Sequence, residues 1–336
     1  MPECGIGKLN SKILIQYIKF IFNRTTSFII TFSITYFIIV SLIYISPGKQ
    51  FYRLINPKLS GELVQQLQEM ENLSFGEFAS DYFIKVIKGD LGVSTRYNDK
   101  VSNVVYEHLK VTVSISLVAY ILQFILCIII ATYLSQHPNS LLDRLADRTS
   151  SIFYSLSTII IAPVLILTFS VLLKVFPIAG FPSYIKSGNP IEVFFIYLRH
   201  LSLPIITLII SLMPMYYKYI REIFYDLSNQ AYVIYLKTLG VNKNKIYFYT
   251  IIPNSMNMLL SVVGVDLGFL LSGTLITEII FGIPGLGRLF YEAILSKDYS
   301  LTISCAMYAA FVFLFVNLLV DIVRIFLDKR LLYRLK

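Results

Sequence analysis

Apolar residues gather into six long stretches along the chain. A helix that crosses the hydrocarbon core of a bilayer needs about 20 mostly apolar residues. The stretches that reach this length are Thr26–Ile45, Val111–Leu134, Ser150–Val175, Leu201–Ile220, Met256–Phe281 and Leu301–Leu327. Pro204 and Pro214 interrupt the fourth, which bundled membrane helices tolerate because neighbours satisfy the freed carbonyl groups. The pattern predicts an all-α polytopic membrane protein with six transmembrane helices.

Residues 1–110 are predicted to hold a signal anchor and a folded outer loop. The first apolar run is too long for a cleaved signal peptide, and no small-residue cleavage site follows it. Further on, Ser74 and Glu77 have the spacing of a capping box. A helix over about Phe75–Lys88 is therefore expected, with Gly89 ending it. This loop either packs on the spans as a small cap or contacts a substrate or an external partner.

The loop between the fourth and fifth stretches, residues 218–254, carries a second helical pattern. Four bulky side chains recur at the spacing of one helix face: Tyr232, Tyr235, Leu236 and Leu239. Gly240 follows where a C-terminal cap belongs, and Asn242 can cap a second short helix. We therefore predict a helix, a glycine turn and a helix. An exposed amphipathic helix of this kind either docks in a partner's groove or lies on the lipid surface.

Composition excludes two other classes of protein. Of the 336 residues, 56% are hydrophobic and 15% are charged, against about 25% charged in soluble domains. The mean hydropathy is +0.69. A soluble domain this poor in charge could not cover its surface, and a disordered chain would be more polar.

The net charge of +9 follows the predicted topology. Lys and Arg residues number 15 in the termini and short loops of one side and 5 in the short loops of the other. Because positive residues favour the cytoplasmic side, both termini are expected in the cytoplasm. The excess therefore gives no reason to expect a nucleic-acid partner.

The chain lacks the usual motifs of catalysis and metal binding. No Gly-x4-Gly-Lys-Ser/Thr loop is present, so ATP hydrolysis by this chain is not expected. His108, His137 and His200 are scattered, and the three cysteines have no metal-ligand spacing. We expect no catalytic residue, no metal site and no cofactor bound by this chain.

Two carboxylates fall inside the fifth apolar stretch, where a charge costs about 2.5–3.5 kcal/mol at the bilayer centre. Asp266 is expected near the midplane, and Glu278 near the outer exit. Asp266 either lines a path, binds a cationic group of a substrate or pairs with a basic residue of a partner. A structural role is expected for Glu278 rather than contact with a solute. Asp321 and Arg324, three residues apart in the sixth stretch, are expected to form an intrahelical pair.

Several motifs resemble the permeases of type I ABC importers, in the oligopeptide, dipeptide and nickel branch. Gly240 stands thirteen residues before Pro253, as in the family's EAA loop, and Asn254 matches that branch. Other matching segments are Gly89-Asp-Leu-Gly-Val-Ser94, Leu271-Ser-Gly-Thr-Leu-Ile-Thr-Glu278, Pro284-Gly-Leu-Gly-Arg-Leu289, Asp298-Tyr299 and Asn317-Leu-Leu-Val-Asp321. The family's small and basic run before the glycine is replaced here by Leu236-Lys237-Thr238-Leu239.

The resemblance implies a MetI-like transmembrane domain over residues 111–327 and a basic cytoplasmic tail over 328–336. It implies half of a translocation pore in the bacterial inner membrane, for peptides or related solutes. The implied partners are a second homologous permease, two cytoplasmic ATPase subunits that bind ATP, and an external solute-binding protein. Tyr232, Tyr235, Leu236, Leu239, Gly240, Pro253 and Asn254 would couple the permease to the ATPases. The alternative hypothesis is an ion-coupled secondary transporter.

Overall fold

The computed structural model describes residues 6–45, 74–182, 189–272 and 274–327, and these segments are almost entirely helical. Five long helices dominate: α1 (Ile6–Ile45), α4 (Val101–Gln136), α7 (Pro190–Ser228), α10 (Ile252–Ser272) and α13 (Tyr299–Leu327). Shorter elements join them: α3 (Phe75–Ile87), α5 (Leu141–Ser155), α6 (Thr158–Leu165), η2 (Ile166–Leu172), α8 (Ala231–Thr238), α9 (Lys243–Ile246), η3 (Tyr247–Ile251), α11 (Leu275–Ile280) and α12 (Leu286–Leu295), where η marks a π-helix.

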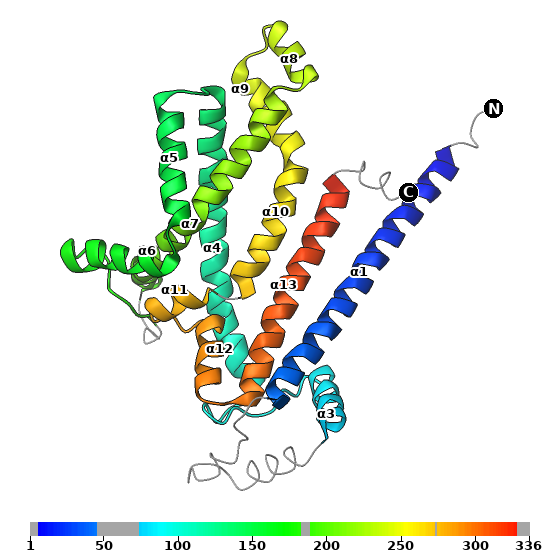
Figure 1. Cartoon of the computed structure of the whole chain (residues 1–336), viewed down its shortest axis with the longest axis vertical. Coiled ribbons are helices and arrows are strands. Elements are labelled where there is room, and N and C mark those ends of the chain that lie inside the picture. The colour runs from blue at the N-terminus through cyan, green and yellow to red at the C-terminus, as the bar shows by residue number, and fades with distance from the viewer. Residues whose placement is uncertain (1–5, 46–73, 183–188, 273, 328–336) are drawn as a thin grey trace.

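The long helices form one bundle (Figure 1). α4 packs against α7, α10 against α13, α13 against α1, and α5 against α7. α8 and α9 lie at one end of this bundle, hereafter the α8 end, and α3 and α12 lie at the opposite end, the α12 end (Figure 1). The start of α1 and the end of α13 lie toward the α8 end (Figure 1).

Five helices of the described segments are long and apolar enough to cross a membrane, and a bent pair makes up to six. The predicted first, second, fourth and sixth spans fall within α1, α4, α7 and α13. Pro204 and Pro214 lie inside α7 without ending it.

The third predicted span, Ser150–Val175, is not one continuous helix. The chain instead turns by 104° between α5 and the α6–η2 pair. Leu156 and Ser157 both have extended backbone, and the Ser157 side chain accepts a hydrogen bond from the Ile159 amide. A serine that caps a new helix competes with continuation of the old one, so the apolar run divides here.

The fifth span, predicted over Met256–Phe281, also departs from a single helix. α10 ends at Ser272, and α11 starts at Leu275 after Thr274, whose φ and ψ of −94° and 62° are not helical. Glu278 therefore lies on a separate short helix rather than on a continuation of α10.

α3 confirms the helix predicted for the outer loop. The Glu77 amide donates to the Ser74 hydroxyl, and the Glu77 carboxylate accepts from the Ser74 amide at 2.9 Å. The Ser74 hydroxyl also donates to the Glu77 carboxylate at 2.8 Å. The bond from the Ser74 amide first, and the bond from the Ser74 hydroxyl second, hold the pKa of the Glu77 carboxyl below its ordinary value. α3 packs on the bundle, because Tyr82 is buried and its hydroxyl lies 3.1 Å from the Ser304 hydroxyl of α13. Residues 46–73 of the predicted loop lie outside the described segments.

An ion pair joins α1 to α13. Asp321 lies 3.6 Å from Arg324, as predicted, and 3.3 Å from Arg24 of α1. The Asp321 carboxylate therefore connects α1 to α13 and also connects two successive turns of α13.

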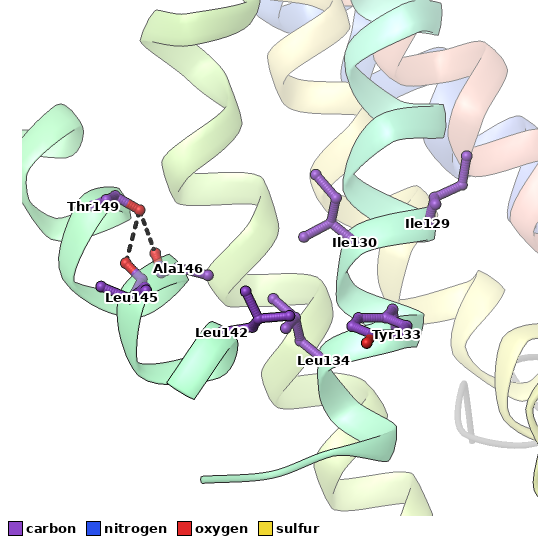
Figure 2. A pocket seen from close by; sticks show the side chains of 8 residues that line it. All are labelled: Ile129, Ile130, Tyr133, Leu134, Leu142, Leu145, Ala146 and Thr149. Atoms are coloured by element: carbon purple, nitrogen blue, oxygen red, sulfur yellow. Dashed lines mark hydrogen bonds between the residues drawn. The ribbon is translucent and has the colours of Figure 1, made fainter. Parts of the chain in front are cut away.

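An open apolar groove of about 420 Å³ lies between α4 and α5 (Figure 2). Leu142 and Leu145 line it from α5, and Ile129 and Ile130 from α4. Thr149 also lines it, but its hydroxyl bonds the Leu145 and Ala146 carbonyls of its own helix. In a bilayer, such a groove can be filled by lipid chains or by apolar side chains, which are equally apolar.

α10 and α13 approach closely because Gly268 has no side chain. A Cβ atom there would lie 2.8 Å from Cδ2 of Phe313 and 3.2 Å from its carbonyl oxygen. Small residues permit such close packing between membrane helices, where dispersion contacts replace the hydrophobic effect.

Replacing Gly268 by valine is therefore expected to destabilise the fold by about 1–3 kcal/mol through overpacking. The measurement is thermal unfolding of the detergent-solubilised protein. Gly76→Ala is the matched control, because a Cβ at that helical position meets nothing within 4 Å. Equal melting temperatures for both variants would contradict the close approach.

Candidate functional site

The loop at the α8 end folds as a helix, a glycine turn and a helix, as its sequence predicts. α8 ends at Thr238, and Gly240 takes a left-handed φ of +74°. The Gly240 amide then donates to the Lys237 carbonyl at 3.0 Å, and the Val241 amide to the Leu236 carbonyl at 3.2 Å. This pair of bonds is a Schellman motif, which satisfies the last carbonyl groups of a helix.

α9 follows at once, and Asn242 caps it. The Asn242 side-chain oxygen accepts a hydrogen bond of 2.9 Å from the Asn244 amide. Ile246 is buried in the core of the bundle, which fixes α9 against the long helices.

One face of α8 holds the helix on the bundle. Val233 is completely buried, and Leu236 packs against the same core. The Lys237 ammonium donates to the Ser228 carbonyl at 2.9 Å, at the end of α7. α8 is therefore fixed in orientation by two apolar contacts and one hydrogen bond.

The opposite face of α8 is open. Tyr235 and Leu239 are 63% and 60% exposed, and Tyr232 lies beside them with 43% exposed. Leu236 departs from the predicted face, because it is half-buried against the bundle rather than presented with the other three. Sequence periodicity did not single out Val233, the residue that anchors α8 most completely.

Pro253 and Asn254 lie in the first turn of α10, and both are exposed. The Asn254 amide group donates to the Thr250 carbonyl at 2.7 Å. The preceding turn, η3, is a π-helix, which fits a proline that cannot donate a backbone hydrogen bond to the turn before it. These two residues therefore shape the start of α10, and they do not lie on the exposed face of α8.

Asp266 lies past the middle of α10, because that helix begins at Ile252 rather than near Met256. Its Oδ2 atom accepts a hydrogen bond from the Tyr216 hydroxyl of α7. The Tyr120 hydroxyl of α4 donates in turn to the Tyr216 hydroxyl at 3.3 Å. Sequence analysis missed both tyrosines, although a hydroxyl group inside an apolar stretch is a signal, since it needs a partner there.

Glu278 is almost completely buried, with 2% of its surface exposed. Its Oε1 atom accepts from the Thr112 hydroxyl of α4 at 2.7 Å, and its Oε2 atom from the Arg288 amide at 2.8 Å. Arg288 is in the first turn of α12, whose N-cap Gly285 has no side chain. The carboxylate thus replaces the missing cap and sits at the positive end of the helix dipole. This geometry favours a structural role over contact with a solute.

A second buried carboxylate, Asp298, joins two of the sequence motifs at the α12 end. Its Oδ2 atom accepts from the Ser94 hydroxyl at 2.7 Å and from the Arg96 amide at 3.2 Å, and its Oδ1 atom accepts from the Leu301 amide. Arg96 also pairs with Glu292 of α12 at 2.8 Å. The segment after α3 is therefore fixed to the start of α13.

Comparison with known protein families shows which family has this helical arrangement. The family described as binding-protein-dependent transport system inner membrane component matches residues 111–333, about two thirds of the chain. The chain belongs to this family. It is a multi-pass permease subunit of an ABC importer, and this membership does not support the alternative of an ion-coupled secondary transporter.

Relatives match the permease over nearly its whole length. A probable peptide ABC transporter permease protein of Sinorhizobium fredii is 24% identical, covering 94% of this chain and 99% of its own. The oligopeptide transport system permease protein AppB of Bacillus subtilis is 26% identical over 86% of this chain and 91% of its own. The dipeptide transport system permease protein DppB of Lactococcus lactis is 23% identical over 93% and 99%.

Gly285→Ala is expected to destabilise the permease by about 3 kcal/mol. The new methyl group would lie 2.2 Å from Cδ of Glu278 and displace a buried carboxylate from its donors. Thermal unfolding measures the loss, and a double-mutant cycle isolates its cause. In a Glu278→Ala background the same glycine substitution is expected to cost far less. Equal costs in the two backgrounds would show that the carboxylate does not set the requirement for glycine.

Proposed function

We propose that this permease forms half of a pore that imports peptides, and that cytoplasmic ATPase subunits drive it through α8. The observation that carries the proposal is the open face of α8, Tyr232, Tyr235 and Leu239, on a helix whose other face is fixed to the bundle. A helix held in this way transmits a push on its open face to α7 and α9, which it contacts. Burial of such side chains in a partner's groove supplies a few kcal/mol.

The proposed complex contains a second homologous permease, two ATPase subunits and an external solute-binding protein. Family membership supports ATPase and binding-protein partners, and the peptide substrate is supported by the names of the relatives. In this proposal the partner subunits bind and hydrolyse ATP, so the permease itself carries no enzymatic activity and needs no cofactor. It lies in the bacterial inner membrane with both termini and the α8 end in the cytoplasm, as the distribution of Lys and Arg favours.

Gly240→Val is expected to uncouple transport. A β-branched residue is strained at φ +74°, so the turn after α8 moves while the buried core remains intact. Uptake by the reconstituted importer should fall by about tenfold, with ATP hydrolysis no longer stimulated by solute. Gly89→Val is the matched control, because Gly89 has the same φ of +74°, nothing within 4 Å of its Cβ position, and a place at the other end of the bundle. Unchanged uptake by Gly240→Val would contradict the coupling role.

A cross-linking experiment separates an ATPase groove from the lipid surface as the site that receives α8. Cys127 and Cys305 are buried, so a cysteine placed at Tyr235 supplies an accessible thiol. With Cys4 replaced by serine, Tyr235→Cys is expected to cross-link to an ATPase subunit in the assembled importer, while a cysteine at the buried Val233 is not. Reaction of the Tyr235→Cys thiol with lipid-soluble reagents alone, and none with the ATPase, would favour the membrane surface instead.

A further inference from the structure

Three helices contribute to one directed line of hydrogen bonds inside the bundle. The Tyr120 hydroxyl donates to Tyr216, and the Tyr216 hydroxyl donates to Asp266. Both tyrosines are buried, and their rings pack edge to face with centroids 5.8 Å apart. Since each hydroxyl points its proton toward the carboxylate, the line stabilises a negative charge at Asp266.

The carboxylate stands at the border of an open face of α10. Met258, Val265 and Phe269 are exposed along that face, while Gly264 and Gly268 turn the other side of the helix toward α13. Asp266 itself is partly exposed beside them. A charged side chain at membrane depth is tolerated where it faces the interior of an assembly or a water-filled path, and not where it faces lipid.

The negative charge has no basic partner within the described part of the chain. No Lys, Arg or His of these segments lies within 4.0 Å of the Asp266 carboxylate, and they hold no cluster of three groups that could bind a metal ion beside it. One carboxylate oxygen already accepts from Tyr216, which leaves the other for a ligand. A guanidinium group is best bound through both oxygens, whereas an ammonium group is a compact charge that one oxygen can receive.

We propose that Asp266 receives the ammonium group of the solute, with Tyr216 positioning the carboxylate and Tyr120 positioning Tyr216. The inference rests on the proposed peptide substrate, because a peptide carries such a group at its amino terminus near neutral pH. The site is an electrostatic step in the path between the two permeases. It requires no particular side chain of the peptide, so it is compatible with solutes of varied sequence.

The test compares uptake of paired peptides by the reconstituted importer. Each pair has one sequence with a free or an acetylated amino terminus, and pairs are chosen that the wild-type importer takes up in both forms. Asp266→Asn is expected to lower uptake of the free form by about tenfold, the cost of one charge-assisted hydrogen bond, and to leave the acetylated form near its wild-type rate. Asp266→Glu should restore part of the loss, and Tyr216→Phe should show a smaller loss with the same selectivity.

Ser261→Ala is the matched control, because the Ser261 hydroxyl donates only to the Asn257 carbonyl of the same helix among the hydrogen bonds of the described segments. This substitution should leave the uptake rates of both peptide forms unchanged. An equal fall for both peptide forms in Asp266→Asn would overturn the ammonium site and indicate a structural carboxylate. An unchanged rate for the free form would overturn it as well. A wild-type importer that takes up no peptide would contradict the proposed substrate, a result visible before any variant is compared.

Discussion

A carboxylate removed from water needs hydrogen-bond donors, and this requirement organises the permease. The buried Glu278 and Asp298 and the partly exposed Asp266 each accept from hydroxyl groups, and the first two also accept from backbone amides. No basic side chain is paired to them among the described residues. At least one donor to each carboxylate comes from a segment distant in the sequence, so each carboxylate fixes two or three elements to one another. A buried carboxylate without its donors would destabilise the fold by more than the satisfied hydrogen bonds stabilise it. The donors and the carboxylate must therefore be present together.

The two ends of the bundle are held in different ways. At the α12 end, Glu278 and Asp298 connect α4, α11, α12, α13 and the segment after α3, and the Arg96–Glu292 pair adds a further contact. At the α8 end, α8 rests on Val233, Leu236 and one hydrogen bond from Lys237. In the proposed importer, motion enters at α8 and passes to the helices that contact it, while the buried carboxylates keep the helices in register at the α12 end.

Local chemistry made several elements predictable from the sequence. The capping box of α3, the glycine turn after α8 and the Asn242 cap depend on residues within a few positions of one another. The division of the third span at Ser157 and the break after Ser272 were missed, because hydropathy alone does not distinguish a long helix from two short ones. Contacts such as Thr112–Glu278 and Tyr216–Asp266 join residues 166 and 50 positions apart, and no local pattern encodes which faces meet. The packing of Leu236 against the bundle was missed for the same reason, because the sequence does not show which side of α8 meets the other helices.

The cap that Glu278 supplies to α12 has a consequence for how relatives of this chain can diverge. Space for its carboxylate exists because position 285 carries no side chain, since a Cβ atom there would lie 2.2 Å from Cδ of Glu278. A Cβ atom at position 287 would instead lie 2.9 Å from the backbone Cα atom of Leu275. A lineage that keeps the glutamate must keep Gly285, whereas one that shortens residue 278 gains room for a capping side chain at 285. Gly287 is needed in both cases, because the Leu275 backbone occupies the space beside it. Positions 278 and 285 should therefore change together or not at all.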